Sequence, residues 1–152
     1  MKDSTRCDDV EEKSLQIENQ VCFSLYSASN ALIRAYKPLL KELDLTYLQY
    51  MTMMVLWQSS PITVKQIGDK LHLDSGTLTP LLKRLQDKGM VNKVRSEKDE
   101  RKVFLHLTEQ GIKLKAKAKS VPHALMCKVN MSVEHALQLK ALSDLLLKQL
   151  TT

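Results

Sequence analysis

The chain has 152 residues, 43% of them hydrophobic, and a formal net charge of +6 at pH 7. This length suits one domain, or one domain with extensions, and this apolar fraction can supply a core. The longest apolar run, Met53 to Trp57, is far too short to cross a bilayer, and the amino terminus has no apolar signal region. We therefore expect a cytoplasmic protein without a membrane partner.

A long amphipathic helix is predicted from Leu15 to about Leu40. Its apolar residues recur at helical spacing, at Val21, Leu25, Ala28, Leu32 and Tyr36. Asn19 is a possible N-cap that would place Cys22 in the first turn, where the helix dipole and free amides favour a thiolate. Ser14 is a rival helix start that would remove this help.

Two capping boxes mark the starts of the next two helices. Thr46 is followed three residues later by Gln49, which predicts a helix running to about Gln58. The same pattern at 63–66 predicts a short helix from Val64 to about Leu71.

The segment Asp74 to Gly89 predicts a helix suited to contact DNA. Its core stripe consists of Leu78, Leu81, Leu82 and Leu85. Asp74 or Ser75 can cap its start, and Gly89 can end it in the left-handed conformation. Its exposed positions carry hydrogen-bond donors that suit phosphates and base edges, namely Ser75, Thr77, Thr79, Lys83, Arg84 and Lys88. Together with the preceding helix it forms a helix-turn-helix, although an ordinary solvated amphipathic helix would show the same stripe.

A β-hairpin is predicted directly after this helix, with strands at 91–95 and 101–107 and a charged tip between them. A hairpin in this position is a wing, whose basic residues can reach a neighbouring groove or the phosphate backbone. Arg101, Lys98 and Lys102 are the candidates for these contacts, and Asp99 is expected to orient Arg101 within the wing.

Positive charge is concentrated in the middle of the chain. Residues 61–119 hold 14 Lys and Arg against 7 Asp and Glu, whereas residues 1–60 hold 6 against 8. A basic excess confined to the helix-turn-helix, the wing and the following helix is typical of a DNA-binding surface. A membrane-surface helix is disfavoured, because the lysines at 113, 115, 117 and 119 alternate and do not share one helical face.

The carboxyl-terminal part is predicted to be helical from Thr108 to about Ser120, interrupted at Val121 and Pro122, and helical again from the cap Ser132 to Leu150. The last helix carries an apolar stripe of Leu139, Leu142, Leu146 and Leu150, which Leu137 and Leu145 widen. This stripe exceeds what one small domain needs, so we expect the terminal helices to bury it against a second subunit. A symmetric dimer also suits palindromic DNA.

Several segments together resemble the MarR family of winged-helix regulators, and most closely its organic hydroperoxide resistance regulators. In the wing these are Asp99-Glu100-Arg101, five further residues, and Leu107-Thr108. The remaining matches are Asn19 to Phe23, Tyr36 to Leu40, Leu45 to Tyr47, Gln49-Tyr50 and Leu73 to Leu85. One departure is Leu48, which stands where close relatives commonly have proline.

The resemblance implies a dimeric repressor whose Cys22 is oxidised by organic hydroperoxides, with Tyr36 and Tyr47 donating hydrogen bonds to its thiolate. From the residues alone, the default interpretation of Cys22 is a small core residue. Cys22 and Tyr36 are fourteen residues apart, which on one straight helix separates them by roughly 21 Å. If both serve one site, the tyrosine must come from a partner helix across the dimer interface.

Cys127 is the candidate resolving thiol, since a sulfenic acid needs a second thiol to form a reversible disulfide. The resemblance places the chain with two-cysteine members of the family, although a lone buried cysteine is an alternative reading. Cys7 lies next to Asp8 and Asp9, where negative charge disfavours a thiolate, and is interpreted as incidental.

The predicted fold is mainly α (α+β): a single domain over 1–152, with a winged helix-turn-helix at about 44–108 and dimerisation helices at about 15–40 and 109–150. The predicted function is a homodimeric repressor of pseudo-palindromic operator DNA that is released by oxidation of Cys22, through an intersubunit disulfide with Cys127. It is not expected to be an enzyme or to hold a cofactor or metal. The alternatives are a MarR-type repressor gated by a phenolic ligand and a thiol peroxidase.

Overall fold

The computed structural model describes residues 13–99 and 101–151. The chain begins there with a short 3₁₀ helix, η1 (Ile17–Asn19), and continues into the long helix α2 (Val21–Lys41). The predicted single helix from Leu15 is therefore wrong at its start. Gln20 adopts an extended backbone and is the N-cap of α2, while the Asn19 side chain donates to the Lys13 carbonyl, so it does not cap α2. Cys22 still lies in the first turn.

The next three helices follow the capping signals closely. Helix α3 (Tyr47–Ser59) and helix α4 (Val64–Leu71) each begin with a complete capping box, from Thr46 and Thr63 respectively. Helix α5 (Ser75–Asp87) is capped by Asp74, and Gly89 follows its end with a φ of 70°. The left-handed backbone at this glycine confirms the predicted helix end.

A three-stranded antiparallel sheet has the order β1-β3-β2, with β1 (Ile62–Thr63), β2 (Val91–Arg95) and β3 (Val103–Leu107). The hairpin register pairs Val91 with Leu107 and Arg95 with Val103. The short strand β1 was not predicted. The predicted strand from Arg101 begins two residues later, because the Lys102 amide donates to the Asp99 carbonyl and closes the hairpin tip instead.

The carboxyl-terminal part forms three helices: α6 (Glu109–Ala118), α7 (Val121–Val129) and α8 (Val133–Leu150). The predicted interruption at Val121 and Pro122 is the start of α7, because proline is tolerated in the first turn of a helix. The segment 123–129 is therefore helical rather than a connection between helices. Ser132 caps α8 as predicted, accepting from the His135 amide.

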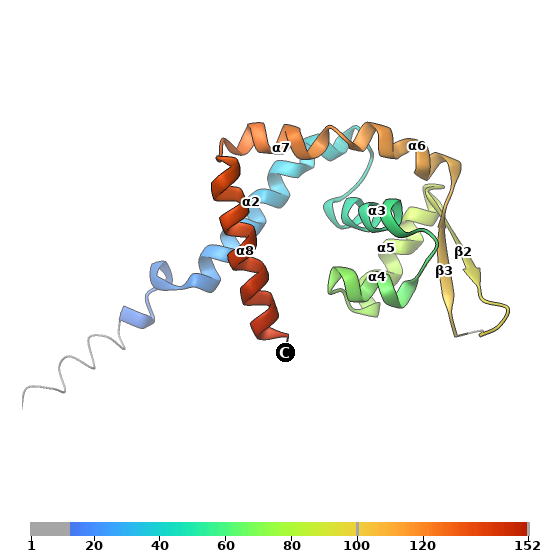
Figure 1. Ribbon diagram of the computed structural model, residues 1–152, viewed down its shortest axis with the longest axis horizontal. Coiled ribbons are helices and arrows are strands. Elements are labelled where there is room, and N and C mark those ends of the chain that lie inside the picture. The colour runs from blue at the N-terminus through green and yellow to red at the C-terminus, as the bar shows by residue number, and fades with distance from the viewer. Residues whose placement is uncertain (1–12, 100, 152) are drawn as a thin grey trace, which may run out of the picture.

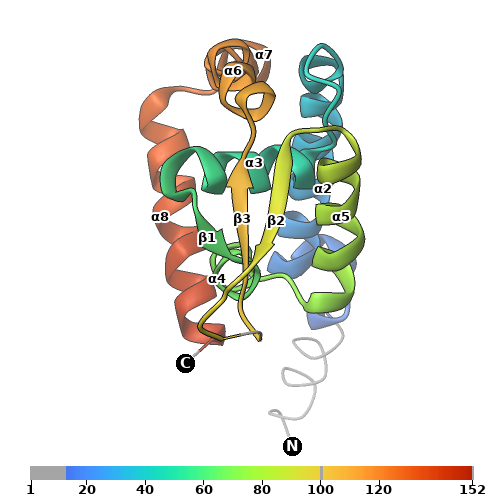
Figure 2. The ribbon, with the colours of Figure 1, turned by 90° about the vertical axis from the view of Figure 1, so that its right-hand side faces the viewer.

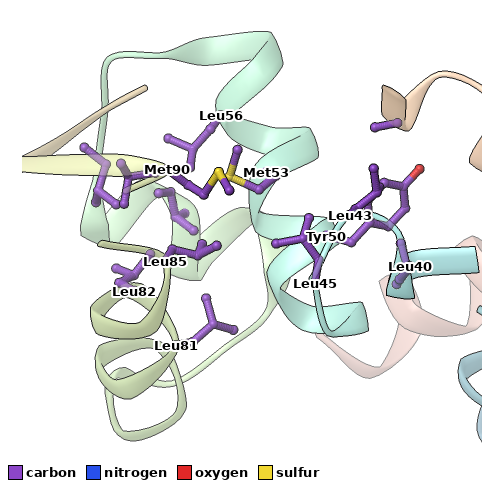
Figure 3. Close-up of a cluster of buried hydrophobic side chains, with 14 of the residues drawn as sticks. Leu40, Leu43, Leu45, Tyr50, Met53, Leu56, Leu81, Leu82, Leu85 and Met90 are labelled. Atoms are coloured by element: carbon purple, nitrogen blue, oxygen red, sulfur yellow. The ribbon is translucent and has the colours of Figure 1, made fainter. Parts of the chain in front are cut away.

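The core lies mainly under the helix-turn-helix and its sheet (Figure 3). It contains all four leucines of the predicted α5 stripe, together with residues of α3, α4 and the wing, among them Tyr50, Met53, Leu56, Ile67 and Leu105. The Trp57 indole donates to the Gly111 carbonyl at 2.8 Å and so ties α3 to α6. Gly111 itself has no room for a side chain, since a Cβ there would lie 2.3 Å from the Met90 carbonyl oxygen.

Helices α6 and α7 run along one edge of the molecule and connect the winged unit to α2 and α8 (Figure 1). Although α2 and α8 cross in that view, they are far apart after a quarter turn (Figure 2). No residue of α8 is buried, and its leucines are exposed, with Leu142 at 66%. Apolar side chains of the amino-terminal half of α2 are exposed as well, namely Val21, Phe23 and Tyr26. No helix in the described ranges could span a membrane.

Candidate DNA interface and thiol site

The first half of the site is the exposed side of α5. Asp74 accepts from the Thr77 amide at 2.8 Å and from the Thr77 hydroxyl at 3.2 Å. These hydrogen bonds lower the pKa of Asp74 below its ordinary value of 3.8, and the one from the Thr77 amide has the largest effect. The cap is therefore ionised at neutral pH. Five of the six donor residues predicted at exposed positions are exposed, namely Ser75, Thr77, Thr79, Lys83 and Arg84, whereas Lys88 is half-buried. The Thr77 hydroxyl proton is committed to the cap, which leaves that oxygen as an acceptor.

A groove of about 720 Å³ joins α5 to the wing. It brings together five of the predicted residues, Ser75, Thr79, Asp99, Arg101 and Lys102. The other candidates, including Lys98 at the tip, lie outside its lining. Two basic residues of this groove, Lys65 of α4 and Lys93 of β2, were not predicted. The position of Lys65 could have been predicted from the sequence, because it lies in the first turn of α4, directly after the Thr63 cap.

Asp99 contacts Arg101 within the wing through the backbone of that residue. Its carboxylate accepts from the Arg101 backbone amide at 3.1 Å and pairs with the Lys102 ammonium at 3.7 Å. Within the described residues, no ion pair joins it to the Arg101 guanidinium. Asp99 therefore holds the backbone at Arg101, and the exposed guanidinium keeps its donors for another partner.

The second half of the site begins with three tyrosines. The rings of Tyr36 and Tyr47 lie 4.9 Å apart, and those of Tyr36 and Tyr50 lie 5.9 Å apart. Burial raises the pKa of Tyr36 and Tyr47 above the ordinary 10.0, and the neighbouring phenols add to the effect at Tyr36. Both phenols are thus protonated at neutral pH and can donate hydrogen bonds. Tyr50 belongs to the same cluster and was not predicted as a site residue.

Cys22 does not join these tyrosines within its own chain. It is exposed in the first turn of α2, where its thiol contacts the Gln20 side-chain oxygen at 3.8 Å. Tyr36 lies on the same unbroken helix, fourteen residues further on, so the rise of the helix separates the two by about 21 Å. Cys22 lies in the first turn of α2, whose amides have no intrahelical partners.

Cys127 lies near the carboxyl end of α7, on the exposed side of that helix. Its sulfur is 3.8 Å from Nδ1 and 4.0 Å from Nε2 of His123, one helical turn earlier. Cys7 lies outside the described residues.

A second hollow, of about 700 Å³, lies beside the tyrosine cluster. Its lining includes Tyr47, and three basic residues of α2 stand around it, Arg34, Lys37 and Lys41. Lys88, at the end of α5, closes one side and pairs with Asp44 at 2.8 Å. This ion pair links the turn before Tyr47 to the end of α5, and it withdraws Lys88 from the exposed donors of that helix.

Three short helices, a wing after the third and long flanking helices define a winged helix-turn-helix transcriptional regulator of the MarR type. The chain belongs to the SarA/Rot family of transcriptional regulators, whose family model matches residues 34–118, and it is similar to the organic hydroperoxide resistance transcriptional regulator of Bacillus subtilis. The identity to that relative is 45% over 136 residues, covering 90% of this chain and 92% of the relative. The predicted resemblance and the predicted fold class are confirmed.

Solved structures of AbfR from Staphylococcus epidermidis are similar to the chain in more than one redox state. The reduced, DNA-bound form matches with a TM-score of 0.75 at 31% identity, covering 93% of this chain and 99% of AbfR. The disulfide form matches with a TM-score of 0.62 at 31% identity, covering 92% of this chain and 98% of AbfR. The relatives are transcriptional regulators, so the thiol peroxidase alternative receives no support from them.

Proposed function

We propose that this chain is a homodimeric, cytoplasmic repressor that binds pseudo-palindromic operator DNA while Cys22 is reduced and releases it when an organic hydroperoxide oxidises Cys22. Residues of about 44–108 form the DNA-binding unit, and the helices at about 15–40 and 109–150 form the dimer. The DNA contacts come from Ser75, Thr77, Thr79, Lys83 and Arg84 of α5 and from Lys98, Asp99, Arg101 and Lys102 of the wing.

One observation carries the redox part: the tyrosines that can donate to a thiolate are gathered, but their own Cys22 is about 21 Å away along α2. A second copy of the chain, with its α2 antiparallel, brings a Cys22 to this cluster. The uncovered apolar side chains of α2 and α8 are the surfaces on which such a dimer would form, since patches of this kind mark interaction sites.

The chemistry at Cys22 needs no cofactor. The thiolate attacks the terminal peroxide oxygen, the O–O bond breaks, and the alkoxide takes up a proton to leave as an alcohol. Cys22 is oxidised to the sulfenic acid and the hydroperoxide is reduced. Protonated Tyr36 and Tyr47 stabilise the thiolate before the attack by donating to it. Condensation with Cys127 then gives a disulfide and water.

The relatives support a switch between two conformations. AbfR is known both in a reduced DNA complex and in a disulfide form. The present chain, with Cys22 and Cys127 both free, is more similar to the former than to the latter at the same 31% identity. A disulfide that reorients the two winged units would weaken their simultaneous fit to two half-sites of DNA.

The test is operator binding by Cys22→Ser, followed by fluorescence anisotropy before and after addition of tert-butyl hydroperoxide. The variant should bind like the wild type, since serine fits an exposed helix position, and should stay bound after the oxidant, since the chemistry needs sulfur. Cys7→Ser serves as the matched control and should be released normally. Release of Cys22→Ser at the wild-type rate would contradict the proposal.

A second candidate is a repressor gated by a phenolic ligand, and the hollow beside Tyr47 is the observation that favours it. Basic residues around an apolar hollow suit an aromatic anion. Cys22→Ser separates the two candidates, because a non-covalent ligand such as salicylate would still release this variant from DNA.

A further inference from the structure

The two cysteines occupy opposite ends of their helices. Cys22 lies at the amino end of α2, whose first amides have no intrahelical partners, whereas Cys127 lies three residues from Asn130, the C-cap of α7. The carboxyl end of a helix presents carbonyl oxygens and offers a sulfur no such donors. A thiol in this position needs another group to take its proton before it can act as a nucleophile.

His123 stands where such a group is required. It precedes Cys127 by four residues, so both side chains share one face of α7. The hydrogen-bond contacts described for the Cys127 sulfur are both to this ring, at 3.8 Å for Nδ1 and 4.0 Å for Nε2. The tautomer with its proton on Nε2 leaves Nδ1, the nearer nitrogen, free to accept from the thiol.

The pair also lies on the open face of α7. Val121 and Leu125 turn inward and are buried, while His123 and Cys127 are exposed. A nucleophile and a base in contact on an open face meet the first geometric requirement for an activated thiol, which is hydrogen-bond reach between the two.

We propose that His123 is the general base for Cys127 in the resolving step, an inference that rests on the proposed function. Nδ1 takes the Cys127 proton as the thiolate attacks the sulfur of the Cys22 sulfenic acid of the other subunit. The S–O bond breaks, the S–S bond forms, and the imidazolium returns the proton to the departing hydroxide, which leaves as water. The sulfenic acid is the oxidant of Cys127, and no further reactant is needed.

The test uses the full-length protein in a Cys7→Ser background, with tert-butyl hydroperoxide as oxidant. Dimedone trapping with mass spectrometry follows the sulfenic acid at Cys22, and non-reducing gels after N-ethylmaleimide quenching follow the disulfide. His123→Gln should slow disulfide formation by about a hundredfold, the low side of general-base effects, and sulfenic acid should accumulate. The rate of Cys22 oxidation should stay within about twofold. His135→Gln, an exposed histidine on α8, is the control and should change neither rate.

Two further readings separate a base from a structural residue. Added imidazole should restore disulfide formation in His123→Ala. If the His123 side chain had only a structural role, free imidazole would not restore it. In a Cys7→Ser, Cys22→Ser background, His123→Gln should slow alkylation of Cys127 by iodoacetamide several-fold, whereas the unfolded chains should react equally. An unchanged disulfide rate, a lack of rescue by imidazole, or unchanged alkylation would each overturn the role of His123. Absence of any dimedone adduct at Cys22 would instead overturn the proposed function, while the alkylation measurement would still decide about His123.

Discussion

The phenol hydroxyls of Tyr36 and Tyr47 are the side-chain groups on which the reactivity of Cys22 should depend. Each sits in a partly buried cluster that keeps it protonated, and each ring packs against its neighbours, so the loss of a hydroxyl changes chemistry more than packing. Phenylalanine is therefore the informative replacement, because it removes the hydrogen-bond donor and keeps the ring.

Tyr36→Phe should slow oxidation of Cys22 by about tenfold, because one hydrogen bond to a charged group contributes at least about 1.5 kcal/mol. Operator affinity of the reduced protein should be unchanged, since Tyr36 lies away from α5 and the wing. Sulfenic acid formation under a fixed hydroperoxide concentration measures the first quantity, and anisotropy measures the second. An unaltered oxidation rate in both Tyr36→Phe and Tyr47→Phe would remove the tyrosines from the sensor.

The same cluster predicts a dependence of stability on alkaline pH. The pKa of Tyr36, Tyr47 and Tyr50 is raised in the folded state, chiefly by burial, from the ordinary 10.0. The neutral phenols therefore add stability below about pH 10, and this contribution is lost as the pH rises through the folded values. Urea unfolding between about pH 9 and 11 should show a falling free energy of unfolding. For Tyr36→Phe this free energy should fall less steeply with pH. A slope equal to that of the wild type would contradict the contribution of Tyr36 to the alkaline loss of stability.

At the scale of elements, α5 and the wing act as one surface because the groove between them is lined from both. The helix is held by its Asp74 cap and by four buried leucines, and the wing tip by the Asp99 carboxylate. Rigid elements on either side leave the exposed cations accessible, and the proposed function assigns them to phosphates and the hydroxyls of α5 to base edges.

Lys83→Ala should weaken binding to all DNA sequences and reduce the slope of log affinity against log salt by about one, because one phosphate contact is lost. Thr79→Ala should instead relax sequence preference with little change in that slope. Anisotropy with operator and scrambled duplexes over a salt series measures both. Lys113→Ala is the matched control, since this lysine pairs with Glu109 on α6. Equal salt slopes for Lys83→Ala and the wild type would exclude Lys83 from the phosphate contacts.

At the scale of the whole molecule, the uncovered apolar faces of α2 and α8 indicate that the protein works as more than one chain. Helix α8 has no buried residue, and apolar residues of α2 are uncovered. Both helices lie on the side of the molecule opposite the wing in Figure 1, so any partner that covers them also fixes the distance between two α5 helices. Dimer geometry and spacing on DNA are thereby coupled.

Oxidised protein should run as a covalent dimer on non-reducing gels, because Cys22 of one subunit meets Cys127 of the other. The dimer band should disappear in Cys127→Ser and persist in Cys7→Ser. Peptide mapping of the oxidised band identifies the two linked cysteines. A monomer containing an internal bond between Cys22 and Cys127 would contradict the crossed arrangement and leave Cys22 as the sensor.

Local signals in the sequence determined the helix starts at Thr46, Thr63, Asp74 and Ser132, because a cap is made by residues within one turn. The four-leucine stripe of α5 and the hairpin after it were equally readable, since periodicity shows which face is buried. Only the tertiary structure decided that Ile62 and Thr63 form a strand, because two residues carry no period and need β3 to pair with. It also placed Tyr50 beside Tyr36, and it brought the Asp99 carboxylate to the Arg101 amide and Lys102. Residues 121–129 form a helix there, which puts His123 and Cys127 on one face. These features depend on contacts between segments or on the exact course of a helix, and residue spacing alone does not encode either.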